Sequence, residues 1–125
     1  MDTAITVIQV LLGLLLTMGG LLKLTLPYAK YVKLPAQGWA KDFKPYHIRL
    51  IGILEVCAGV GMIIPLLLGS LTMLAPLAAV GIALVMAGAM ATHLRRAEYP
   101  IMVGNLMWLG IALFVAYSKL VGVAV

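Results

Sequence analysis

The sequence predicts an all-α fold: an integral membrane four-helix bundle with both termini on the same side of the membrane. Two observations carry this prediction. First, 64% of the 125 residues are hydrophobic and only 10% are charged, whereas soluble domains hold about 25% charged residues. Second, a helix crosses the ~30 Å hydrocarbon core of a bilayer with about 20 apolar residues. Runs of that length lie at 4–26, 48–68, 71–93 and 99–121.

We expect residues 1–125 to form a single transmembrane domain, because little besides the segment 27–47 lies outside these runs. That leaves no room for a soluble enzyme domain. The net charge of +5 is not a nucleic-acid signal, because most of the basic residues lie in or beside two connections, 27–49 and 94–98. The positive-inside rule places both connections in the cytoplasm and both termini outside.

The first run, 4–26, carries Lys23 near its end. Lys23 shares a helix face with Gly19 and Gly20, at offsets of four and three residues. Small residues mark contacts between helices in lipid, so Lys23 is predicted to point into the bundle. The alternative is that its ammonium group reaches the lipid headgroups from the helix end.

The segment 27–47 is rich in proline, lysine and aromatic residues. Trp39, Phe43 and Tyr46 follow one another at spacings of four and three residues, which predicts a common helix face. Aromatic and lysine side chains are typical of a short amphipathic helix at the membrane surface. This segment is therefore interpreted as an interfacial helix, either a lid over the polar side chains or a plain connector.

The second run, 48–68, contains Glu55, the most informative residue of the chain. A carboxylate within an apolar run costs a few kcal/mol to insert and normally faces a partner inside the protein. Gly52, Ala58 and Gly59 lie on the same stripe, so a neighbouring helix can come close to Glu55. Pro65 is expected to end or kink this helix.

The third run, 71–93, has an alanine at every fourth position from Ala75 to Ala91. This ladder predicts close packing against a helix of the same chain or of a second copy, so a homodimer is one arrangement left open. His93 follows on a different face. In the fourth run, Asn105 shares a stripe with Trp108 and is expected to form hydrogen bonds between helices.

Antiparallel connections bring four polar side chains to the same end of the bundle, where they are predicted to form a cluster: Lys23, Glu55, His93 and Asn105. In one interpretation the cluster only holds the bundle together. In the other it lines a pocket, with Trp108 nearby, that binds the polar head of an apolar ligand or passes protons to a quinone-like carbonyl. No metal site is expected, although Met86, Met90 and His93 share a face and thioethers suit Cu(I). The single Cys57 excludes an internal disulfide.

Three motifs resemble the DoxX-like family of small four-helix membrane proteins: G-G-L-L-K-L at 19–24, I-G-I-L-E-V at 51–56 with Pro65 after it, and T-H-L-R-R at 92–96. The resemblance covers nearly the whole chain. It implies a four-helix bundle in a bacterial inner membrane and an association with redox systems. The motifs around Lys23 and Glu55 are also similar to a eukaryotic branch of the family that assists the assembly of pentameric receptors.

We therefore expect an accessory protein rather than an enzyme, one that binds an apolar ligand or a partner helix near the polar cluster. The alternative is a quinone-interacting membrane subunit of a redox system; no other cofactor is indicated. Expected partners are membrane lipid, an apolar small molecule and another membrane protein.

Overall fold

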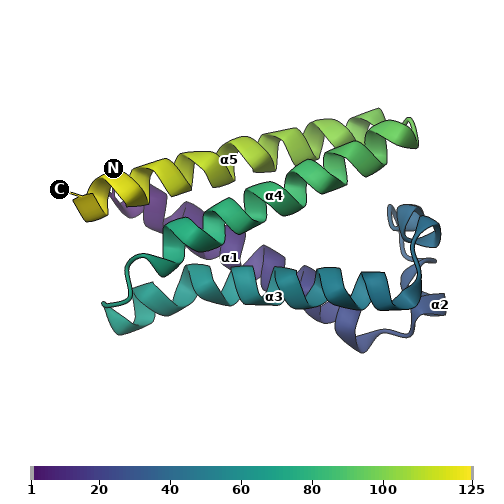
Figure 1. Cartoon of the computed structure of the whole chain (residues 1–125), viewed down its shortest axis with the longest axis horizontal. Coiled ribbons are helices and arrows are strands. Elements are labelled where there is room, and N and C mark those ends of the chain that lie inside the picture. Colours follow the sequence, from purple (N-terminus) through teal and green to yellow (C-terminus); the bar gives the residue numbers. More distant parts are fainter. Residues whose placement is uncertain (1, 125) are drawn as a thin grey trace.

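The computed structural model describes residues 2–124, which are helical over most of that range. Four helices are long and apolar enough to span a membrane: α1 (Asp2–Thr25), α3 (Pro45–Leu68), α4 (Leu74–Arg95) and α5 (Tyr99–Ala124). Two short helices, α2 (Tyr28–Tyr31) and η1 (Gly38–Asp42), lie between α1 and α3. The start of α1 and the end of α5 lie at the same end of the bundle (Figure 1), so the predicted fold class is confirmed.

The outer faces of the long helices are covered with large apolar side chains. Leu11, Leu84 and Leu113 are all more than half exposed, and Leu84 reaches 70%. An apolar surface of this extent would lead to aggregation in water. In a bilayer the lipid chains cover it, so the outward-facing leucines are those of an integral membrane protein.

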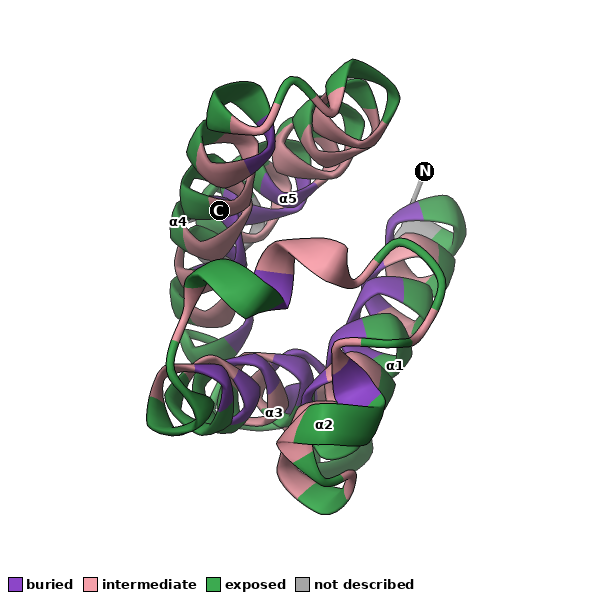
Figure 2. Ribbon diagram, turned by 90° about the vertical axis from the view of Figure 1, so that its right-hand side faces the viewer, coloured by how far each residue is buried: buried purple, intermediate pink, exposed green. Residues whose placement is uncertain are grey.

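The four long helices form two antiparallel pairs, α1 with α3 and α4 with α5. Helices α3 and α4 also pack together, whereas α1 and α5 barely meet. The pairs lie close where α3 turns into α4 and separate toward the opposite end (Figure 1). Viewed onto that opposite end, the segment carrying η1 crosses between the pairs (Figure 2).

Glycines bring the backbones of α1 and α3 into direct contact. A Cβ atom added to Gly20 would lie 2.6 Å from the carbonyl oxygen of Gly52, and one added to Gly59 would lie 2.6 Å from that of Gly13. Only glycine fits at such a contact, which is a common way for membrane helices to pack. The glycine seam between α1 and α3 therefore lies within one chain.

The predicted alanine ladder packs over only part of its length. Ala75, Ala79 and Ala83 are buried, whereas Ala87 and Ala91 are exposed. The difference follows from the divergence of the two helix pairs. The alanines in the first half of α4 contact neighbouring helices, whereas those in the second half face outward.

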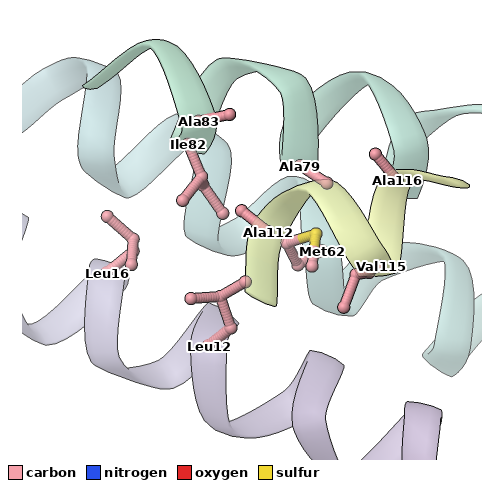
Figure 3. Close-up of a cluster of buried hydrophobic side chains, with 9 residues drawn as sticks. All are labelled: Leu12, Leu16, Met62, Ala79, Ile82, Ala83, Ala112, Val115 and Ala116. Atoms are coloured by element: carbon pink, nitrogen blue, oxygen red, sulfur yellow. The ribbon is translucent and has the colours of Figure 1, made fainter. Parts of the chain in front are cut away.

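An apolar core fills the bundle from its middle toward the end that holds the termini. All four long helices contribute to it (Figure 3): Leu12, Leu16, Met62, Ala79, Ile82, Ala83, Ala112, Val115 and Ala116. Gln9 is fully buried and donates a hydrogen bond of 2.6 Å from Nε2 to the carbonyl of Met62. The opposite half of the bundle lacks an apolar core of this kind among the residues described, and there the polar side chains gather.

Helix α3 runs through Pro65 instead of ending there. It stops three residues later, where Gly69 adopts a left-handed conformation (φ 64°) and donates its N–H to the carbonyl of Pro65. This is a common helix end for glycine. At its start, Pro45 occupies the first turn, where its missing N–H costs nothing.

The connection between α1 and α3 does not form the single amphipathic helix predicted for it. Trp39 belongs to η1, Phe43 follows it in an extended conformation, and Tyr46 lies in the first turn of α3 with 59% of its surface exposed. Pro45 is the cause, because a residue that precedes proline avoids the helical region, and Lys44 is extended here. The connection instead packs on α3 through a small core of Tyr31, Ala40 and Ile48.

Candidate functional site

An ion pair between Lys23 and Glu55 joins α1 to α3 inside the apolar part of the bundle. Lys23 Nζ lies 2.6 Å from Glu55 Oε1, and each side chain is only 10% exposed. The glycine seam makes this possible, since a Cβ at Gly52 would lie 2.9 Å from Cβ of Lys23. In surroundings of low dielectric constant, each charge depends on the other for compensation.

Two aromatic rings of the connection cover the lysine. The ammonium group of Lys23 lies 5.6 Å from the ring centre of Tyr31 and 6.0 Å from that of Trp39, within the range of cation–π interactions. Gln37 holds both rings, because its Oε1 accepts hydrogen bonds from Tyr31 Oη (3.0 Å) and Trp39 Nε1 (2.8 Å). Burial raises the pKa of Tyr31 above its usual value, so this phenol remains neutral and keeps its proton.

His93, near the end of α4, lies next to Trp39. It is buried, and the rings of His93 and Trp39 meet edge to face with their centres 6.2 Å apart. Its Nδ1 lies 2.8 Å from Oε1 of Glu98. Glu55 pairs with Lys23, and the carboxylate that contacts His93 comes from the adjoining turn.

The same turn is connected to η1 through Arg96. Its Nε lies 3.2 Å from Oε1 of Glu98, and its Nη1 lies 3.0 Å from both carboxylate oxygens of Asp42. The hydrogen bond from His93 and the charge of Arg96 hold the pKa of Glu98 below its usual value, so Glu98 stays ionised. These contacts fasten η1 to the α4–α5 pair across the end of the bundle.

A cavity of about 580 Å³ lies beneath η1, between the two helix pairs. Apolar side chains of α3, α4 and α5 form most of its wall. Its polar lining includes Lys23, Glu55, His93 and Asn105, and Trp39 and Phe43 contribute aromatic surface from the connection. This is the half of the bundle in which the helix pairs have separated.

The cavity brings together most of the residues singled out from the sequence, but two of them lie elsewhere. Trp108 packs against the apolar core, one turn beyond Asn105. The ring of Tyr46 lies beside that of His47, with ring centres 4.2 Å apart and planes inclined by 47°. Neither lines the cavity.

Sequence reasoning missed Gln37 and Glu98, which position the rings of the site. Gln37 lies between Pro35 and Gly38, where a polar side chain suggests only a solvated loop. Glu98 lies five residues after His93. A carboxylate so close to a histidine across a helix end was the available signal for their contact.

Fold and site together define a class: an integral membrane four-helix protein with a cavity near one membrane surface and a charge pair in its wall. Residues 7–115 match the DoxX-like family. That is most of the chain, and the protein belongs to this family, as the sequence motifs indicated. No curated protein and no solved structure matches the chain.

Proposed function

We propose that this protein is a membrane accessory protein that holds one apolar molecule in the cavity beneath η1. The cavity itself is the observation that carries the proposal: an apolar wall interrupted by a few polar groups. Pockets of this composition bind small molecules through the apolar surface and orient them through the polar groups. The apolar body of a ligand lies against α3, α4 and α5, and its polar head lies near His93 and Asn105.

A small molecule fits this site better than a partner helix. The volume of about 580 Å³ falls within the ~300–1,000 Å³ typical of ligand pockets. A transmembrane helix would need a groove along the length of the bundle, whereas this cavity occupies one end and is covered by η1. The receptor-assembly role suggested by the eukaryotic branch is therefore the less favoured proposal.

Quinones are one ligand class that suits the cavity. They combine an apolar tail with a flat, polar ring, and the rings of Trp39 and Phe43 provide flat surface in the lining. A role beside a quinone-dependent redox system is the second candidate function. It differs from simple ligand storage in requiring a redox partner in the same membrane.

Native mass spectrometry of the purified protein tests the proposal. We expect wild type to carry an apolar adduct, and Ala89→Trp to lose it, because Ala89 lines the cavity and an indole there occupies much of it. Gly110→Trp is the matched control. Gly110 lies outside the lining, with nothing within 4 Å of an added Cβ, so this variant keeps the adduct.

The same spectra separate the alternatives. A quinone among the extracted molecules favours the redox candidate, and a complex of two chains reveals a homodimer. Wild type free of any adduct, together with failure to take up added apolar molecules, contradicts the proposal.

The basic residues of the connections also support an orientation in the membrane. We propose that the protein lies in a bacterial inner membrane with these connections on the cytoplasmic side. We expect Lys33→Cys to resist an impermeant maleimide in intact cells and to react after the membrane is opened, because the positive-inside rule places this end in the cytoplasm. Ser70→Cys, in the connection at the opposite end, should react in intact cells. Both changes require a Cys57→Ser background. Labelling in the reverse pattern contradicts the orientation.

A further inference from the structure

The ion pair in the cavity wall is already compensated by its surroundings. Lys23 Nζ contacts Glu55 Oε1 and the rings of Tyr31 and Trp39. Glu55 Oε2 lies against α1, 3.5 Å from where a Cβ of Gly19 would be. Because the pair carries no net charge, a charged ligand would bring an uncompensated charge into a site of low dielectric constant. The ligand that fits is neutral.

Two other side-chain oxygens of the lining are also engaged. The hydroxyl of Thr92 donates to the carbonyl of Gly88 at 3.0 Å, and Gln37 Oε1 accepts from two rings. His93 and Asn105 differ from these. Among residues 3–121, whose side chains are described, neither Nε2 of His93 nor the side-chain amide of Asn105 has a hydrogen-bond partner. These two groups are free to meet a ligand.

The contact with Glu98 determines which ring nitrogen of His93 carries the hydrogen. An ionised carboxylate only accepts hydrogen bonds, so Nδ1 of His93 carries the hydrogen in the 2.8 Å contact. In the neutral ring Nε2 is then a hydrogen-bond acceptor. This nitrogen is not sealed within the protein, unlike Oε1 of Gln9, and His93 belongs to the cavity lining. The cavity thus presents an acceptor at His93 and a donor at the amide of Asn105.

The two groups lie at different depths. His93 is two residues from the end of α4, and Asn105 is six residues from the start of α5, which corresponds to about 3 Å and about 9 Å along the helices. A ligand that meets both therefore carries two polar atoms separated along its length, as an aromatic ring does with oxygens at opposite edges.

We propose that His93 and Asn105 select the ligand, and that it is a neutral apolar molecule bearing a hydroxyl group, of the phenol or hydroquinone class. The hydroxyl donates to Nε2 of His93, and a second, deeper oxygen accepts from the amide of Asn105. This inference rests on the proposed function of the cavity. It assigns the recognition of the ligand to these two residues and a structural part to the Lys23–Glu55 pair.

Binding of a para-alkoxyphenol and of its methyl ether to the purified protein tests the inference. The two probes share their apolar parts and the second oxygen, but only the phenol can donate. We expect wild type to bind the phenol about tenfold more tightly, the equivalent of one hydrogen bond. His93→Phe should abolish this preference, and Thr25→Val, which removes an exposed hydroxyl outside the lining, should keep it.

A second variant makes the test independent of the folding of His93→Phe. Asn105→Leu preserves side-chain size and breaks no side-chain hydrogen bond among the residues described, and we expect it to weaken both probes equally while the preference for the phenol remains. Equal affinity of wild type for the two probes overturns the inference but leaves the cavity as a binding site. If neither probe binds wild type, or if Ala89→Trp binds the probes as tightly as wild type does, the inference is overturned and the result counts against the proposed function as well.

Discussion

Glu55→Met and Lys23→Met are each expected to destabilise the bundle by about 3–5 kcal/mol, because each leaves a buried charge without its partner. The double variant is expected to recover most of that loss. Methionine is close in size to both side chains, so the pair of thioethers fills the same space without any charge to compensate. The 2.6 Å contact between Nζ and Oε1 and the low exposure of both groups place this pair among the strongly coupled ones.

Reversible unfolding of the four proteins in lipid–detergent mixtures measures this coupling as a double-mutant cycle. Thr25→Val serves as the control, because it removes from the same turn of α1 an exposed hydroxyl that donates to the carbonyl of Leu21 in its own helix. If the two single changes add up in the double variant, the residues act independently and the pair does not hold α1 to α3.

Much of this pair could be predicted from the sequence. Glu55 lies well within one apolar run and Lys23 near the end of another, and each has glycines at helical spacing on its own face. Since an isolated charge is costly in a membrane and small residues mark helix contacts, the two faces were expected to meet. The number of helices could also be predicted, because each helix that crosses lipid requires a long apolar run and the sequence contains four such runs.

The cavity and its roof could not be predicted in the same way. They depend on the divergence of the helix pairs, which involves residues distant in the chain: at one end Leu12 of the α1–α3 pair and Ile82 of the α4–α5 pair share one apolar core, and at the other end η1 crosses between the pairs. Helical periodicity was also misleading across Pro45, because Trp39 and Tyr46 have the right spacing but lie in different elements. His93 was placed at the correct end, yet its nearest carboxylate comes from a turn whose course no periodicity describes.

Adding a single methyl group is expected to destabilise the protein most in the glycine seam between α1 and α3. Gly20→Ala should destabilise the protein by at least about 1–3 kcal/mol, the usual cost of overpacking, because the new Cβ would lie 2.6 Å from the carbonyl oxygen of Gly52 and 2.9 Å from the backbone nitrogen of Val56. Backbone atoms cannot turn aside as a side chain does. The two helices must therefore move apart, and the Lys23–Glu55 contact one turn away lengthens with them.

Gly104→Ala is the matched control, since an added Cβ there meets nothing within 4 Å and alanine favours the helix by up to about 1 kcal/mol. The two substitutions are chemically identical, yet we expect opposite signs in the free energy of unfolding. In the background of the double methionine variant, Gly20→Ala should cost less than in wild type, because no ion pair remains to be stretched. An equal cost in both backgrounds would mean that the seam and the charge pair stabilise the bundle separately.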